Sequence, residues 1–494
     1  MRKKLAFVLI LFMLLSSFPY LRFSPVGVVN STNDYPVHNI DTGLNYTTIQ
    51  AAIDAPETKN GHTLFVESGT YYEHVTVTKS LSLIGQSANT TIIDAFFVES
   101  AVHIMADNVR FEGFTVTHGG ENFPNGGILL QLSTNCTISD NIAIDNKMGI
   151  LLISSNGNSI SDNVVSNNIH GVELYGYSNK NVLESNNISD NNAGILLSQS
   201  SGNMIKSNAI SRNNFGIEIG GASNDNMISG NTVSDAGAVG IRSVDQSVRN
   251  IILNNIVTRS LDAFDLTYAN DCMLIGNTAS FNSRYGIIIG SSNNSLVIAN
   301  DLVNNGYGLR IYYPNTNNTI SHNNFISNTH QTDTFSSPLN NKWDEGYPSG
   351  GNYWSNYNGT DVFIGPFQNQ TGSDGIGDQP YIIDGNNKDN YPWMTIYRPE
   401  WPFGYETLTA YFELKAKYGS LESYWHALAN NYSSLQEDCR DLNATYTAGL
   451  NDLAGLRNLV YASIAATAIL AGTTIILAVV VYGKRSARKE KDKT

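Results

Sequence analysis

Cysteine is scarce in this sequence, which excludes one whole class of fold. The chain of 494 residues contains three cysteines, Cys136, Cys272 and Cys439, and three cannot all pair within one chain. A framework of disulfides is therefore excluded as the source of stability. Because the chain is longer than one ordinary compact domain, we expect several domains or one elongated array of repeats.

Charged residues are also few, at 15% of the chain, and the formal net charge is −14. A weakly charged, acidic surface argues against nucleic acid or an anionic membrane as the partner of the main body. It is compatible with a polar, neutral partner such as a glycan.

The N-terminus predicts export. Three basic residues at positions 2–4 precede an apolar stretch at 5–15, which is typical of a secretory signal, and we place this signal at residues 1–29. No clear small-x-small cleavage site follows, so an uncleaved N-terminal anchor is the alternative. Eleven N-x-S/T sequons lie beyond residue 29. Export makes them candidate glycosylation sites, although a chain rich in Asn, Ser and Thr also produces such triplets by chance.

A small residue recurs every 22 to 24 residues through the middle of the chain, and an apolar-x-apolar triplet follows it. Branched apolar residues at the first and third places are the signature of a strand with one buried face. The recurring residues are Gly127, Gly149, Gly171, Gly194, Gly216, Gly240, Ala263, Gly286 and Gly308.

An asparagine recurs with nearly the same interval, flanked by apolar residues three places before and two places after. A unit this short cannot bury a core alone and must stack on its neighbours at ~4.8 Å per coil, which would align the amides as a hydrogen-bonded ladder. Leucine-rich repeats would need fixed leucines and a helical half, and both are missing. The pattern predicts an all-β, right-handed parallel β-helix of about 10–12 coils. Its asparagine column is Asn141, Asn163, Asn186, Asn208, Asn231, Asn254, Asn277, Asn300 and Asn323.

The array has predicted boundaries. We place an N-terminal cap and the first coils at 40–101, the repeats at 102–330 and a C-terminal cap segment at 331–400. A short amphipathic helix at 49–53 would cover the open end, whose first coil otherwise exposes apolar side chains.

Both ends of the array resemble a known family. The segments IQAAIDA (49–55), SGTYYE (68–73) and SLSLIG (80–85) resemble the start of NosD-type periplasmic β-helix proteins, and 343–361 with 372–394 resembles their C-terminal cap. The resemblance is to the surface-anchored type found in archaea. It implies a pectin-lyase-like β-helix linked to carbohydrate binding and sugar hydrolysis.

The family's name also implies copper delivery, which is our least favoured alternative. Copper needs clusters of His, Met or Cys. The nine histidines are scattered, and Met148, Met204, Met227 and Met273 stand singly in different coils.

The tail has a different pattern. Aromatic residues and leucines repeat every seven positions from Tyr411 to Val460, which predicts a coiled-coil stalk at 405–458. An amphipathic helix that packs on the body is the alternative. Cys439 would face its copy in a parallel homodimer, so we predict an interchain disulfide there. The uncharged stretch 459–482 is long enough to span a bilayer, and the basic tail 483–494 predicts a cytoplasmic C-terminus with the bulk of the chain outside.

The outward column of the glycine-led strands is the candidate site, because neighbouring coils bring its side chains ~5 Å apart. Glu218, Arg242 and Asp265 would be consecutive, with their carboxylates two coils, ~9.6 Å, apart. An inverting glycosidase needs carboxylates about 6.5–9.5 Å apart, and lyases of this fold class use a basic residue near acidic ones. These three are the candidate catalytic residues. The full column is Leu129, Leu151, Glu173, Leu196, Glu218, Arg242, Asp265, Ile288 and Arg310.

Tyrosines border this column and could stack on sugar rings. A solvated strand face that alternates charges is the plainer interpretation. We expect a surface-anchored protein that binds extracellular polysaccharide or envelope components. A membrane-tethered lyase or glycoside hydrolase acting on acidic polysaccharide is the alternative. The candidate ligand-binding residues are Glu173, Tyr175, Tyr268, Arg310 and Tyr312, with Tyr177 and Tyr313 nearby.

One acidic run could hold calcium, although no cofactor is required by the pattern. Asp374, Asp378 and Asp384 are candidate ligands because hard cations take clustered oxygens. Their spacing does not fit an EF-hand, and a turn-rich cap is the default.

Overall fold

The computed structural model describes residues 28–29, 33–312, 314–334 and 340–398, together with six residues between 467 and 474. The chain divides into a unit of residues 1–417 and a unit of residues 418–494, in which the described residues are helical. The predicted stalk and basic tail lie outside the described residues, as do nearly all of the signal and most of the membrane span. Within the described part of the chain, no helix is both long and apolar enough to cross a bilayer.

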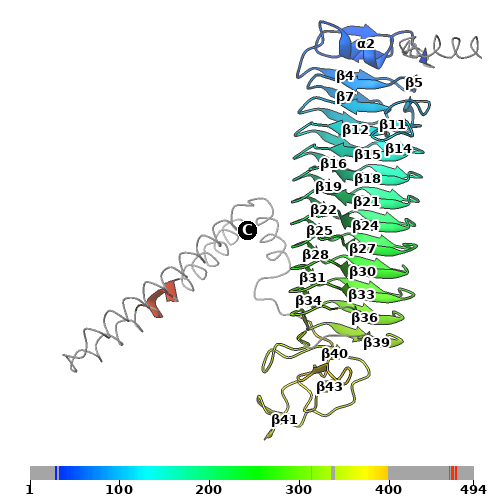
Figure 1. Cartoon of the computed structure of the whole chain (residues 1–494). Helices are drawn as coiled ribbons and strands as arrows, with labels where there is room; N and C mark the ends of the chain where they lie inside the picture. The colour runs from blue at the N-terminus through cyan, green and yellow to red at the C-terminus, as the bar shows by residue number, and fades with distance from the viewer. Residues whose placement is uncertain are drawn as a thin grey trace, which may run out of the picture. The chain divides into compact units, whose positions relative to one another are not determined.

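Three long sheets, parallel except at β1, β2 and β3, form a right-handed β-helix of about 12 turns, which confirms the predicted fold (Figure 1). Through the repeats, each turn contributes one strand to each sheet. Sheet A contains β1 (Val28–Val29), β5 (Gly69–Tyr72), β8 (Thr91–Asp94), β11 (Thr115–Thr117), β14 (Ile142–Ile144), β17 (Val164–Ser166), β20 (Asn187–Ser189), β23 (Ala209–Ser211), β26 (Thr232–Ser234), β29 (Ile256–Thr258), β32 (Thr278–Ser280), β35 (Asp301–Val303), β38 (Asn324–Ile326) and β40 (Tyr353–Trp354). Sheet B contains β2 (Val37–Asn39), β3 (Leu44–Tyr46), β4 (Thr63–Val66), β7 (Ser82–Gly85), β10 (Arg110–Glu112), β13 (Thr137–Ser139), β16 (Ser159–Ser161), β19 (Val182–Glu184), β22 (Met204–Lys206), β25 (Met227–Ser229), β28 (Ile251–Leu253), β31 (Met273–Ile275), β34 (Leu296–Ile298) and β37 (Thr319–Ser321). Sheet C contains β6 (Val75–Val77), β9 (Val102–Ile104), β12 (Ile128–Gln131), β15 (Met148–Ile153), β18 (His170–Tyr175), β21 (Ala193–Ser198), β24 (Phe215–Gly220), β27 (Val239–Ser243), β30 (Asp262–Thr267), β33 (Tyr285–Gly290), β36 (Tyr307–Tyr312) and β39 (His330–Asp333).

The glycine column marks a close approach between successive strands of sheet C. A Cβ at Gly149 would lie 2.5 Å from the carbonyl oxygen of Gly171. A Cβ at Gly216 would lie 2.3 Å from the carbonyl oxygen of Gly240. Real Cβ atoms do not approach an oxygen so closely, so glycine recurs because the backbones of neighbouring turns meet there.

The asparagine column forms the predicted ladder, with one correction. Asn208 donates from Nδ2 to Oδ1 of Asn231 at 2.9 Å. The next member is Asn255, whose Oδ1 accepts from Nδ2 of Asn231 at 2.9 Å, and not the predicted Asn254. The turn that precedes it is longer, because Asn231 and Asn255 are 24 residues apart. A shift of one residue moves every side chain to the other face, so Val257 is buried and Ile256 is exposed.

Two further ladders, which the sequence did not single out, follow the other turns of each coil. In one, Asn168 donates to Asn191 and Asn191 to Asn213, at 3.1 and 3.0 Å. In the other, Asn158 donates to Asn181 at 3.0 Å. Every buried amide of these ladders also forms a hydrogen bond with the backbone. The polar groups of the turns therefore have hydrogen-bond partners inside the protein.

The ends of the core are closed by two caps (Figure 1). The helix α2 (Ile49–Asp54) covers the N-terminal end, as predicted, with Ile49 and Ile53 fully buried and Thr48 capping its first turn. At the other end, the buried Trp354 stacks on Phe325 at 4.1 Å and on Tyr381 at 4.2 Å. Two hairpins complete this cap: β41 (Phe363–Ile364) with β42 (Gln370–Thr371), and β43 (Tyr381–Ile382) with β44 (Lys388–Asp389).

Candidate functional site

The outer face of sheet C carries the column that the sequence singled out. Its nine members, from Leu129 to Arg310, lie directly beside one another on successive strands. Asp333 on β39 pairs with Arg310 and extends the column by one turn. The predicted stacking is therefore confirmed, and the neighbours of each side chain are known.

The N-terminal part of this face is apolar and closed. Leu129 and Leu151 are buried although they point away from the core, and they pack with Met148. Phe123, in the loop between β11 and β12, reaches Tyr175 on β18 with ring centroids 5.3 Å apart. This loop lies within residues 102–330, which the sequence pattern assigned to the repeats. The polar strip therefore begins at β18.

Two polar contacts organise the middle of the strip. The carboxylate of Glu173 lies 2.7 Å from Nδ1 of His170. Further along the strip, between β24 and β27, Nη2 of Arg242 lies 2.7 Å from Oε1 of Glu218. The guanidinium of Arg242 also sits 4.0 Å above the ring centroid of Phe215. Two of the predicted catalytic residues, Glu218 and Arg242, are thus paired with each other.

Asp265, the third predicted catalytic residue, is adjacent to Arg242 in the register but takes a different partner. Its Oδ1 accepts a hydrogen bond from the hydroxyl of Thr267 at 2.5 Å. Burial raises the pKa of Asp265 to about 6, against the opposing effects of Thr267 and of the charge on Arg242. Nearby, the carboxylate of Asp262 accepts hydrogen bonds from both Nε and Nη2 of Arg284. The strip therefore holds a protonatable carboxyl between two ion pairs.

An aromatic cage holds Arg310 at the C-terminal end of the strip. Its guanidinium carbon lies 5.0 Å from the ring centroid of Tyr285 and 5.1 Å from that of Tyr312. It donates to the hydroxyl of Tyr285, and its Nε lies 3.6 Å from Asp333. These contacts fix the position of the charge.

A row of stacked rings runs beside this cage. Tyr307 lies 5.3 Å from Tyr285 and 4.6 Å from His330, measured between ring centroids. A cavity of 440 Å³ adjoins the end of the row. It is lined by Ser327, Asn328, Thr329, His330, Gln331, Thr332, Ser355, Asn356 and Tyr381.

The structure separates the candidate ligand-binding residues into two groups. Glu173, Tyr175, Arg310 and Tyr312 all lie on strands of sheet C, in the column or next to it. Tyr268 lies beyond the end of β30, in a turn with φ of 58°, and its side chain is 55% exposed. The sequence missed Tyr285, Tyr307 and His330, although all occupy the first place of their strands, where an aromatic residue in successive repeats is a readable signal.

The predicted calcium ligands do not come together. Among the described residues, no group of three His, Cys, Asp or Glu side chains is placed to hold a metal ion. The carboxylates satisfy separate turns, which compete for their oxygens. Asp374 accepts the backbone N–H of Ile376, Asp378 those of Val362 and Phe363, and Asp384 those of Asn386 and Asn387.

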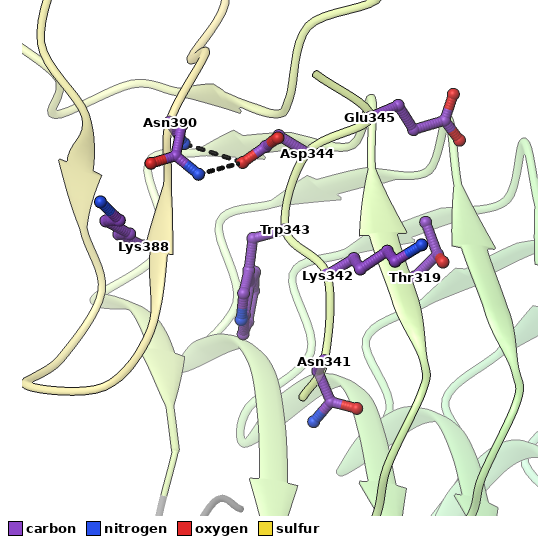
Figure 2. Close-up of a pocket in the computed structure, with 8 residues that line it drawn as sticks. All are labelled: Thr319, Asn341, Lys342, Trp343, Asp344, Glu345, Lys388 and Asn390. Carbon is purple, nitrogen blue, oxygen red and sulfur yellow. Dashed lines mark hydrogen bonds between the residues drawn. The ribbon is translucent and has the colours of Figure 1, made fainter. Parts of the chain in front are cut away.

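A second hollow, of 610 Å³, lies at the C-terminal cap on the sheet B side. Figure 2 shows Asp344 bonded to Asn390, through the backbone N–H at 2.9 Å and the side-chain amide at 2.8 Å. Trp343 is buried in the cap. Because Asp344 and Trp343 serve the cap itself, this hollow is less suited to a ligand than the strip on sheet C. Its lining is Thr319, Asn341, Lys342, Trp343, Asp344, Glu345, Lys388 and Asn390.

Comparison with known proteins identifies the family. The family model described as "Periplasmic copper-binding protein (NosD)" matches residues 58–235 and 219–359, which together cover more than half of the chain. A cell surface glycoprotein of Methanothermus fervidus is 42% identical over 106 residues, which are 21% of this chain and 17% of that protein. The match thus spans less than a fifth of that relative's length.

Solved structures share the fold at low sequence identity. The A-module of the mannuronan C-5 epimerase AlgE6 from Azotobacter vinelandii has a TM-score of 0.53 at 16% identity, over 60% of this chain and 92% of that one. The Dettilon tailspike protein has a TM-score of 0.48 at 18% identity, over 56% of this chain and 63% of that one.

The described residues do not fit a copper centre. Cys136 and Cys272 are buried singly, and burial raises the pKa of both thiols, that of Cys272 to about 11. The sequence suggested that the methionines stand singly, but Met204 and Met227 are neighbours in register on sheet B. They pack with Leu253 and Ile275, however, and so belong to an apolar cluster with no nitrogen or thiolate ligand in it.

Proposed function

We propose that this chain, which belongs to the periplasmic copper-binding protein (NosD) family, binds an extracellular glycan on the outer face of sheet C. The observation that carries the proposal is the strip from Glu173 to Asp333. Its charged and aromatic side chains are held in place by one another, from the pair of Arg242 and Glu218 to the cage around Arg310.

The chemistry of the strip suits a sugar polymer. The row of rings that includes Tyr307, together with Tyr312, offers apolar surface to the C–H groups of sugar rings, while carboxylates and guanidinium groups bond to hydroxyls. Side chains recur every ~4.8 Å along the axis. A polymer that lies along the strip would therefore meet another side chain of the column at each step.

We place the protein at the cell surface. The similarity to a cell surface glycoprotein of Methanothermus fervidus supports this location, as do the predicted signal and the basic tail after residues 459–482. In this proposal the span 459–482 anchors the chain, the stalk 405–458 forms a homodimer with Cys439 at its seam, and exposed sequons carry glycans.

A membrane-tethered glycoside hydrolase or lyase is the second candidate. It is favoured by Asp265, whose pKa of about 6 suits a general acid. Glu218 lies two turns away in the column, at ~9.6 Å along the axis, which is close to the separation of an inverting pair. The ion pair between Arg242 and Glu218 disfavours it, because a paired carboxylate is a weak base.

A glycan array probed with the full chain tests the proposal. We expect binding that falls at least tenfold in Tyr307→Ala and is unchanged in Phe281→Ala, an exposed aromatic control that directly follows β32 of sheet A. An array without hits would refute glycan binding. Release of reducing ends or unsaturated uronates, lost in Asp265→Asn, would instead establish the enzymatic candidate.

A further inference from the structure

Three arginines lie on the sheet C side, and each is already paired with a carboxylate of a neighbouring turn. The contacts run between side chains of different turns of the β-helix, so they are part of the folded strip. They are Arg242 Nη2 to Glu218 Oε1 at 2.7 Å, Arg284 Nε to Asp262 Oδ1 at 2.8 Å, and Arg310 Nε to Asp333 Oδ2 at 3.6 Å.

These arginines are not free to change partner. The side chain of Asp262 is 2% exposed, so removal of Arg284 would leave a buried charge without compensation. The Nε atoms of Arg242 and Arg310 are closed to solvent, and each guanidinium packs on an aromatic ring. A ligand anion would therefore meet cations whose charge is already neutralised.

Two carboxylates remain on the strip without a basic partner of this kind. Glu173 contacts His170, and Asp265 accepts from Thr267. Over the described ranges, neither forms an ion pair with a lysine or an arginine. Lys147, at the N-terminal edge of the face, is held by the carbonyl oxygen of Glu121. The strip thus offers acceptors and an excess of negative charge, in a chain whose formal net charge is −14.

We infer that the ligand of this strip is a glycan without acid groups, an inference that rests on the proposed glycan binding. Its hydroxyl groups would donate hydrogen bonds to Asp265, which is partly exposed. Glu173 is 5% exposed and would act on the ligand through its charge. A polyuronate instead brings one carboxylate per sugar toward these two groups, and like charges at close range cost affinity. The arrangement selects against acidic polysaccharide by the two carboxylates that no lysine or arginine neutralises, and not by the lack of cations.

Matched glycans that differ only in charge test the inference. Acidic oligosaccharides and their carboxyl-reduced forms, equal in length and linkage, are titrated against the full chain by calorimetry at pH 7. We expect the reduced form to bind at least tenfold tighter than the acidic one. In the double variant Glu173→Gln, Asp265→Asn this preference should shrink severalfold, whereas Glu184→Gln on sheet B should leave it unchanged.

Each outcome of this titration either supports or overturns the inference. If the acidic form binds equally well or more tightly, the inference is overturned, and a selective loss of that form in Arg242→Gln would identify the arginine as its partner. If neither member of any pair binds, glycan binding itself fails, and the inference fails with it. A preference for the reduced form that survives the double variant would also overturn it, because the two carboxylates would not be the cause.

Discussion

The register of the asparagine ladder allows a sharp prediction at two adjacent residues. Asn255 is fully buried, and its Oδ1 accepts from the backbone N–H and from Nδ2 of Asn231, both at 2.9 Å. Its Nδ2 donates to the carbonyl of Ile228 at 2.9 Å. Asn255→Ala removes these contacts. It leaves at least the N–H of Asn231 and the carbonyl oxygen of Ile228 without this hydrogen-bond partner. At about 1–3 kcal/mol for each buried unsatisfied group, the loss is about 4 kcal/mol.

Asn254 is the matched control, because the sequence pattern alone assigned it to the ladder. It has a φ of 54°, in the left-handed region, and donates nothing to the ladder. Glycine adopts this conformation without strain, so Asn254→Gly should change stability by less than about 1 kcal/mol. Urea unfolding followed by far-UV circular dichroism measures both. Equal losses of unfolding free energy in the two variants, or a larger loss in Asn254→Gly, would refute the assigned register.

Three further predictions concern single residues. Burial raises the pKa of Asp265 to about 6, so its ionisation opposes folding as the pH rises through the range between its ordinary pKa and 6. Asp265→Asn should therefore stabilise the protein by roughly 2–3 kcal/mol at pH 8 and by almost nothing near pH 3.5, which urea midpoints at the two values would show. Trp354→Ala removes the stacking on Phe325 and Tyr381 and the bond from Nε1 to Asp389. It should cost about 3–5 kcal/mol and deprotect amides of the last turns first in hydrogen exchange, and protection unchanged there would contradict its role as a plug. Cys439→Ser should abolish a dimer band on non-reducing gels, and a wild-type chain that runs as a monomer without reductant would exclude the disulfide.

The fold was predictable because the physics of stacking repeats itself in every coil. Glycine recurs where two backbones touch, as at Gly149, and asparagine recurs where an amide must satisfy the turn above and the turn below. The pattern slipped by one residue at Asn254, because two asparagines stand side by side and the preceding turn is longer. Spacing alone cannot choose between neighbours. The hydrogen bonds from Asn231 to Asn255, the burial of Val257 and the exposure of Ile256 do so.

The candidate site was predictable in position but not in pairing. The column from Leu129 to Arg310 follows from the register. The sequence does not show that Arg242 forms its ion pair with Glu218, or that Asp265 accepts its hydrogen bond from Thr267. That choice depends on side-chain rotamers across strands. The reach of Phe123 to Tyr175 was missed for a similar reason, since a loop between two strands carries no period that would reveal where it lies.

Composition alone does not determine whether the carboxylates of an acidic run converge on one point. Asp374, Asp378 and Asp384 are close in sequence, but each carboxylate caps its own set of backbone N–H groups. Turns rich in glycine and asparagine need such acceptors, so a run of aspartates in a cap is explained without a cation.

Footprinting of the bound glycan is the most direct test of the central claim. Hydroxyl-radical labelling of the full chain, with and without a glycan that binds on the array, reports which side chains the ligand covers. We predict protection of Tyr307, Tyr312 and His330 on sheet C, and none at Phe281 or at Val164 on sheet A. Protection confined to sheets A or B, or to the hollow around Lys342 and Lys388, would contradict the assignment of the binding face.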